Sequence, residues 1–224
     1  MALILIIETS TAKLSVALAR DGKVLASKIS DEARLQASLT APFVKEVLDQ
    51  AGYSVKDLDA VCVGKGPGSY TGLRVGVSTA KGLCFGAGIP LIAIGSLDAL
   101  VAGSGVREGL VVPMIDARRM EVYTAVFSPD GEQLTPVEAK IVDSGAFATE
   151  LSAGPVLFIG DGAIKCASVI SHPNASFREA WPLAQDLAPL AEKAFEQKRF
   201  EDLAYFEPFY LKDFVATVSR KNLF

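Results

Sequence analysis

Apolar and polar positions in the first hundred residues follow two periods, one typical of strands and one of helices. The isoleucine-rich run at 3–7 is typical of a strand buried on both faces. Asp21-Gly22, between two further β-like segments, is a strong signal for a two-residue hairpin turn. The predicted elements are strands at 3–7, 14–19 and 23–28, a helix at 33–51, a strand at 59–63, a helix at 71–86, a strand at 90–94, and a short helix ending at Ala102 with Ser96 as its N-cap.

The same order of elements begins again near residue 110. The Asp-Gly turns at Asp21 and Asp130 lie 109 residues apart, and Gly64-x-Gly66 precedes Gly160-x-Gly162 by 96. Two copies of this length favour a duplicated α/β domain over a stacked array. We divide the chain into a first half, 1–104, and a shorter second half with a C-terminal tail, 105–224. The second half is predicted to hold strands at 110–115, 121–127 and 132–140, with a turn at 129–131, a helix at 144–152, a strand at 156–159, a further helical segment, and a closing helix at 183–200.

The stretch VGKGPGSYTGLRVG at 63–76 joins a predicted strand to a predicted helix. Its glycines leave backbone N–H groups free, and those groups with a helix N-terminus behind them favour a phosphate or carboxylate. The spacing matches neither a P-loop nor the dinucleotide fingerprint. The alternative is a tight strand-to-helix turn that binds nothing.

Acidic residues follow the first strand of each half, Glu8 in one and Asp116 in the other. Both glycine turns also lie at carboxyl ends of strands, where open α/β sheets bind ligands. The duplication therefore predicts a phosphate-and-magnesium cleft between the halves, although both acids could simply cap turns. The residues assigned to this cleft are Glu8, Thr9, Gly66, Gly68, Ser69, Asp116, Asp161 and Gly162.

Composition narrows the function classes. The net charge is −4 and no segment carries a run of Lys or Arg, so the sequence predicts no autonomous nucleic-acid binding. Three scattered cysteines favour a reducing compartment, and with no long apolar run or basic leader we expect a cytoplasmic protein without membrane contact. The only histidine, His172, sits in a turn sequence. A histidine metal cluster, a Ser-His-Asp triad or a Cys-His dyad would each depend on that residue.

Several segments together resemble a known family. The opening resembles the actin, hexokinase and Hsp70-like ATPase fold, which implies an α/β chain of two ribonuclease-H-like halves with mixed sheets. The glycine stretch resembles the signature of the TsaB (YeaZ) family, whose older label is peptidase M22. The segments that carry the resemblance are IIETS at 6–10, LSVAL at 14–18, GPGSYTGLRVG at 66–76, IDAR at 115–118, EVY at 121–123 and PFYL at 208–211.

The resemblance implies an accessory, dimerising subunit of the machinery that attaches threonylcarbamoyl to adenosine 37 of ANN-decoding tRNAs. It implies a TsaD-type catalytic subunit and a TsaE-type ATPase as partners, a homodimer when alone, and tRNA contact only through the complex. The catalytic relative carries a metal-binding His-x-x-x-His on its first long helix, and the corresponding segment here, 31–39, has no histidine. Many members of the family keep one histidine near this point, where this chain has Arg34 and Gln36. We therefore expect no metal and no catalytic residue here, no cofactor on the isolated chain, and ATP or ADP with Mg²⁺ only in the complex. Peptidase activity is not expected.

An interface is predicted on the helix at 71–86, where Gly72, Gly76 and Ala80 form a stripe of nearly bare backbone. Packing inside the same chain is the alternative. Leu35, Leu39 and Phe43 are assigned to the same interface, and Arg74, Arg118 and Arg119 to tRNA contact in the complex. A different class of function, a small-molecule kinase or ATPase, would place Glu8, Asp116 and Asp161 around Mg-ATP. The short second half leaves little chain for an adenine pocket.

Overall fold

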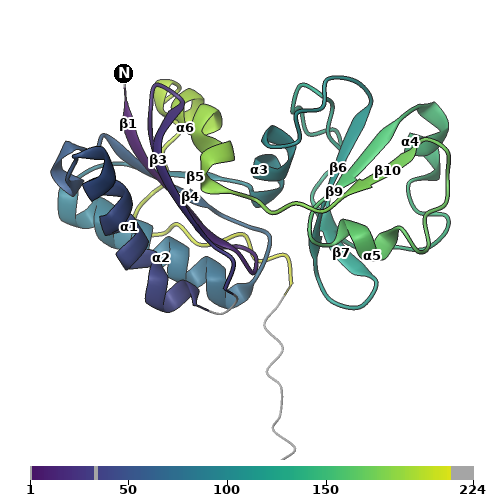
Figure 1. Ribbon diagram of the computed structural model, residues 1–224, viewed down its shortest axis with the longest axis horizontal. Helices are drawn as coiled ribbons and strands as arrows, with labels where there is room; N and C mark the ends of the chain where they lie inside the picture. The colour runs from purple at the N-terminus through teal and green to yellow at the C-terminus, as the bar shows by residue number, and fades with distance from the viewer. Residues whose placement is uncertain (1, 33–34, 213–224) are drawn as a thin grey trace, which may run out of the picture.

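The computed structural model describes residues 2–32 and 35–212, which form two lobes side by side, each built on a five-stranded mixed sheet (Figure 1). In the first lobe β1 runs antiparallel to β2 and parallel to β4. Asp21 and Gly22 both have left-handed φ, of 52° and 70°, which confirms the predicted hairpin turn. The strands, in spatial order, are β3 (Lys23–Ser30), β2 (Leu14–Arg20), β1 (Leu3–Glu8), β4 (Ala60–Gly64) and β5 (Leu91–Ile94).

The second lobe repeats this topology. Its central strand is again antiparallel to the following strand and parallel to the one after the next helix, so the predicted duplication and α/β fold class are confirmed. The edge strand at 175–178 is additional to the predicted elements. The strands, in spatial order, are β8 (Glu138–Ile141), β7 (Glu121–Thr124), β6 (Leu110–Asp116), β9 (Val156–Ile159) and β10 (Ala175–Arg178).

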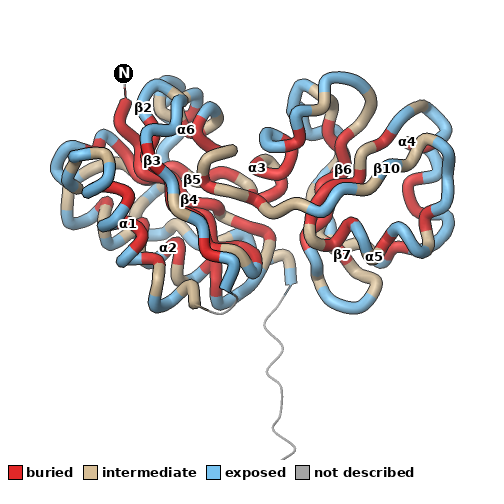
Figure 2. The backbone as a smooth tube through the Cα atoms, viewed as in Figure 1, coloured by how far each residue is buried: buried red, intermediate tan, exposed pale blue. Residues whose placement is uncertain are grey.

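Helices cover both faces of the first sheet, and the central strands are correspondingly buried (Figure 2). Leu5 and Ile7 point toward α1 and α2, whereas Ile4 and Ile6 point toward α6, as the two-residue period of a strand requires. The predicted start of the first helix at residue 33 lies outside the described residues. The helices are α1 (Gln36–Ala51), α2 (Tyr70–Ala87), α3 (Ser96–Ala102), α4 (Ala148–Ala153), α5 (Ala163–Cys166) and α6 (Ala188–Glu196), with short 3₁₀ turns at η1 (Val55–Asp57) and η2 (Ala184–Leu187).

The chain returns to the first lobe after β10, so the closing helix does not belong to the second half, 105–224, to which it was assigned. Ala184, Ala188 and Ala191 are buried against the first sheet, and the backbone amide of Ala184 donates a 2.8 Å hydrogen bond to the hydroxyl oxygen of Ser15. The second lobe therefore comprises roughly the residues between α3 and η2. The single closing helix predicted at 183–200 is a 3₁₀ turn followed by α6.

The two lobes share a buried contact at α3. Leu97 and Leu100 of this helix pack with Val111 and Phe127 of the second lobe. Ser96 is the first residue of α3 rather than its N-cap, which is Gly95, so the predicted capping role of Ser96 is wrong. None of the helices within residues 2–32 and 35–212 is both long and apolar enough to span a membrane.

Candidate functional site

The glycine run holds the turn after β1 against the start of α2. A methyl group on Gly72 or Gly76 would lie within 3.0 Å of Thr9, and one on Gly68 within 3.0 Å of Ser10. Thr9 Oγ1 donates a hydrogen bond to the carbonyl oxygen of Gly72 (2.8 Å). These glycines therefore serve a close approach within the chain.

The predicted interface on Gly72, Gly76 and Ala80 is consequently wrong. Ala80 is fully buried in the core between α1, α2 and the sheet, and the two glycines are covered by Thr9. The same correction applies to Phe43, which is buried in that core, whereas Leu39 packs against the core and is only partly buried. Leu35 lies just before α1 and is half-buried.

Glu8 is sealed inside the first lobe and does not face a cleft. Its side chain is fully buried; Oε1 accepts a hydrogen bond from the amide of Ser10 (2.6 Å), and Oε2 accepts one from the hydroxyl of Ser96 (3.0 Å). Burial raises the pKa of this carboxyl, and these hydrogen bonds oppose the rise. The carboxylate also occupies the space that a side chain at Gly64 would need. Glu8 thus ties β1 to α3, and its assignment as a cleft ligand is wrong.

Several backbone groups of the predicted phosphate loop already form hydrogen bonds within the chain. The amide of Ser69 donates to the carbonyl oxygen of Ser10 (2.6 Å), and the Ser69 hydroxyl oxygen accepts from the amide of Gly72 (3.3 Å). The Gly66 carbonyl oxygen accepts from the amide of Ser96 (2.9 Å). This geometry agrees with the alternative of a tight strand-to-helix turn.

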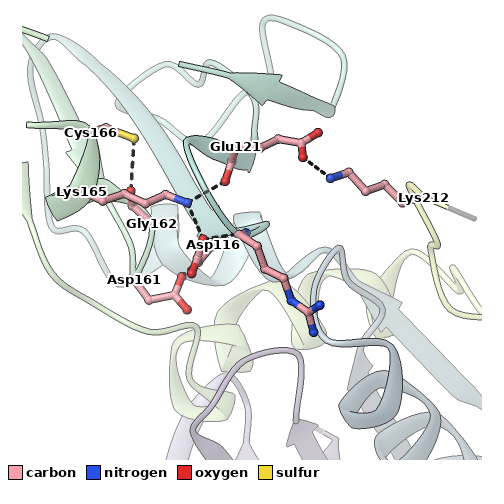
Figure 3. Close-up of polar contacts among 8 residues, drawn as sticks. Asp116, Glu121, Asp161, Gly162, Lys165, Cys166 and Lys212 are labelled. Carbon is pink, nitrogen blue, oxygen red and sulfur yellow. Dashed lines mark hydrogen bonds and ion pairs between the residues drawn. The ribbon is translucent and has the colours of Figure 1, made fainter. Parts of the chain in front are cut away.

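The acids of the second lobe form a group of their own (Figure 3). Asp161 Oδ1 accepts a hydrogen bond from the amide of Asp116 (3.0 Å), and Asp116 Oδ1 accepts one from the amide of Arg118 (2.8 Å). Lys165 of α5 forms an ion pair with Asp116 and donates to the carbonyl oxygen of Glu121 (2.7 Å). Burial, with the charge of Asp116 adding to it, raises the pKa of Asp161 to about 6.

Gly162 permits close packing beneath these acids. Its amide donates to the carbonyl oxygen of Met114 (3.0 Å), and a methyl group there would approach Val122 to 2.9 Å. Within the described residues, no hydrogen bond or ion pair joins the Glu8 group to the Asp116 group, and no cluster of three or more His, Cys, Asp or Glu could hold a metal. Lys165 was not among the predicted site residues; the signal for it is its place four residues after Asp161, one helical turn along the chain.

The three arginines assigned to RNA are exposed. Arg74 lies over the ring of Tyr70, 5.3 Å from its centroid. Arg118 and Arg119 follow β6 with left-handed φ of 75° and 53°, a conformation uncommon for side chains other than glycine, asparagine and aspartate. The turn is held by Glu121, whose amide donates to the carbonyl oxygen of Arg118 (3.1 Å).

A second small-residue stripe, Ser78, Gly82 and Gly86, lies on the outer face of α2. All three residues are exposed, and methyl groups on Gly82 and Gly86 would meet nothing within 4 Å. Phe85 beside them is 83% exposed. On the neighbouring helix α1, Ala37 and Ala41 are also exposed. We call this surface of α1 and α2 the outer helix face.

Comparisons of the sequence and of the structure with known proteins identify a family, curated relatives and solved structures that resemble this chain. Residues 24–219 match the family model described as tRNA N6-adenosine threonylcarbamoyltransferase (TsaD). The tRNA threonylcarbamoyladenosine biosynthesis protein TsaB of Escherichia coli is 32% identical over 95% of this chain and 96% of its own length, and the Bacillus subtilis TsaB is 36% identical over 70% of each. The crystal structure of a Pseudomonas aeruginosa protein with similarity to peptidase YEAZ superposes with a TM-score of 0.84 at 29% identity, covering 95% of this chain and all of that one.

Proposed function

This chain belongs to the TsaB family and takes part in tRNA threonylcarbamoyladenosine biosynthesis, and we propose that it does so as a non-catalytic scaffold subunit. In this proposal it binds a TsaD-type transferase and supports formation of threonylcarbamoyladenosine at position 37 of ANN-decoding tRNAs. It self-associates when alone, and a TsaE-type ATPase joins the assembly.

The observation that best supports the proposal is the outer helix face, with its exposed glycines and Phe85. Glycine inside a helix costs about 1 kcal/mol relative to alanine, and neither Gly82 nor Gly86 repays that cost by packing within the chain. Small residues on a helix surface let a second helix approach closely, and a largely exposed Phe85 offers an apolar anchor. We place the transferase on this face, and a second copy of the chain on it in the transferase's absence.

The acidic groups support a scaffold over an enzyme. Phosphoryl transfer needs carboxylates that can hold a metal and amides that can cradle phosphate. Glu8 is fully enclosed, Asp116 is paired with Lys165, and the Ser69 amide is bonded to Ser10. We propose that ATP or ADP with Mg²⁺ is held only in the assembled complex.

We propose that tRNA also reaches this subunit only in the complex. The chain carries a net charge of −4 and lacks a basic run, so it offers little counterion release of its own. Arg74, Arg118 and Arg119 are exposed cations that can add phosphate contacts once the partner has positioned the tRNA.

A single bulky substitution on the outer helix face tests the proposal. Gly82→Leu should weaken binding to the TsaD-type partner at least about tenfold, since the new side chain separates the two helices, and should reduce tRNA modification accordingly. The melting temperature of the variant should not fall when it is compared with the unsubstituted chain at a protein concentration low enough for both to be monomeric, because the site is open within the chain. Calorimetric titration of the partner and a modification assay give the two readouts.

The matched control is Ser152→Leu, which adds the same side chain to an exposed position of α4 in the second lobe. It should bind the partner as the unsubstituted chain does. Unchanged partner affinity of Gly82→Leu would refute the placement of the partner on this face. Metal-dependent peptidase activity or steady ATP turnover by the isolated chain would refute the scaffold role itself.

A further inference from the structure

A cavity of about 360 Å³ opens at the carboxyl edge of β4 and β5, where the two lobes and the returning C-terminal segment meet. Lys65 and Asp98 line it from the first lobe, Gln133 and Val137 from the second, and Leu190 and Arg199 from the returning segment. Apart from Gly66, none of the residues assigned to the phosphate cleft lines it. Carboxyl edges of parallel strands are the usual ligand-binding edge of α/β sheets.

Three charged groups around this cavity have no ion-pair partner among the described residues. Asp98, in the first turn of α3, forms no ion pair with Lys65 or Arg199 within 4.0 Å. Both cations are nonetheless close enough to lower the pKa of the Asp98 carboxyl, although burial outweighs them and raises it. The folded chain therefore keeps a half-buried carboxylate at a cost, with two positive groups nearby but apart from it.

The cavity is also lined by apolar side chains and by one side-chain amide. Val137 and Leu190 supply apolar surface from opposite sides, and Gln133 supplies both donor and acceptor atoms. The volume is at the lower end of the range for ligand pockets, which suits a small metabolite. One negative and two positive groups, the exposed Arg199 among them, line this small cavity without pairing, and they match a ligand that carries both charges itself.

We propose that this interlobe cavity binds a small zwitterion of the α-amino-acid class. The ligand's ammonium group pairs with Asp98, its carboxylate lies between Lys65 and Arg199, and its side chain packs against Val137 and Leu190. This binding site is independent of the scaffold role and of the outer helix face. The charges that the cavity keeps apart are then neutralised by the ligand rather than by each other.

Calorimetric titration of the full-length protein with the standard L-amino acids tests the proposal. At least one should bind saturably with one site per chain. The matched analogues of leucine that lack one charge, 3-methylbutylamine and 4-methylpentanoate, should each bind at least about tenfold more weakly than leucine if leucine binds. If another amino acid binds most tightly, its two analogues that lack either the carboxylate or the ammonium group are compared in the same way. Asp98→Asn and Lys65→Met should each weaken the binding of that amino acid at least about tenfold.

The variants distinguish a ligand site from a structural role. Asp98→Asn should not lower the melting temperature, because it removes the ionised form that burial disfavours. Lys23→Met, an exposed lysine on β3, is the matched control and should bind as the unsubstituted chain does. No saturable binding of any amino acid up to about 10 mM would overturn the proposal. So would equal binding of the singly charged analogues, or phosphate or ATP binding that is lost in Lys65→Met.

Discussion

One added methyl group should have opposite effects at two glycines of the same helix. In Gly82→Ala the new methyl group meets nothing, so the better helix propensity should stabilise the chain by about 1 kcal/mol. In Gly76→Ala it would lie within 3.0 Å of Thr9 Oγ1, which is hydrogen-bonded to Gly72, so we expect a loss of about 1–3 kcal/mol. Urea denaturation at low protein concentration measures both. A stabilising effect of Gly76→Ala would contradict this prediction, because it would mean that the turn at Thr9 shifts away from the new methyl group at little cost in free energy.

The half-buried Asp161 should make the stability of the chain fall with rising pH. Its pKa is about 6 in the folded chain against an ordinary 3.8, so the folded state binds the proton more tightly than the unfolded state does. The stabilising contribution of the protonated group is complete below pH 3.8 and is lost as the pH rises through 6. The free energy of unfolding of Asp161→Asn, relative to that of the unsubstituted chain, should therefore increase by up to about 3 kcal/mol from pH 4 to pH 7.

Chemical denaturation across that pH range, with the exposed Asp49→Asn as control, measures the difference. The asparagine can still accept the hydrogen bond from the Asp116 amide, so packing is preserved. A pH-independent difference between Asp161→Asn and the unsubstituted chain would contradict the burial argument.

Sequence reasoning located Glu8 correctly but not its environment. The apolar run before it identifies the end of a buried strand, and the duplication identifies Asp116 as its counterpart. What differs is the neighbour: Ser96, 88 positions away, donates to Glu8, whereas Lys165 pairs with Asp116. Such long-range partners leave no local pattern, so the sequence could not distinguish a sealed carboxylate from one at the surface.

At the level of elements, helix α2 shows why the interface prediction chose the wrong face. Small residues recur every four positions on two faces, at Gly72, Gly76 and Ala80 and again at Ser78, Gly82 and Gly86. Helical spacing identifies both stripes but not which one faces the sheet. The decision is made by the Thr9 turn, which requires bare backbone opposite it. The stripe chosen from the sequence is thus the one buried within the chain.

The two Asp-Gly turns both form as predicted, but the strands on either side of them differ in length. Asp21-Gly22 joins β2 directly to β3, with Arg20 opposite Lys23. Around Gly131 the turn also forms, because the Gly131 amide donates to the carbonyl oxygen of Ser128 (3.0 Å). Yet β7 has already ended at Thr124, and beyond it the fully buried Phe127 forms single bridges, to Gln133 across the turn and to Val111 of β6. A local turn signal is therefore reliable for the turn, whereas burial of Phe127 between the lobes decides which strands continue.

At the scale of the whole molecule, the sequence repeat predicted the two sheets but not the path of the last segment. Apart from Leu187, the buried residues of η2 and α6 are small and could cover either sheet; they are Ala184, Ala188, Ala191 and Ala194. Their actual place on the first sheet follows from Ile4 and Ile6, which need cover on the face opposite α1 and α2. The Glu201 amide then donates to the carbonyl oxygen of Leu91, and the Phe209 amide donates to that of Lys65, so the segment follows the first lobe as far as Phe209. Lys212 then forms an ion pair with Glu121 of the second lobe.

This path predicts that the first half of the chain cannot fold by itself. A fragment of residues 1–104 would leave Ile4, Ile6 and Ile92 exposed on one face of the sheet, and we expect it to aggregate or to lack fixed tertiary structure. A chain in which a long Gly/Ser linker replaces residues 105–183, and which keeps 184–212, regains α6 and should fold cooperatively. Near-ultraviolet circular dichroism and thermal melting compare the two. If the 1–104 fragment melts cooperatively without α6, the returning segment is an accessory to the first lobe rather than part of its core.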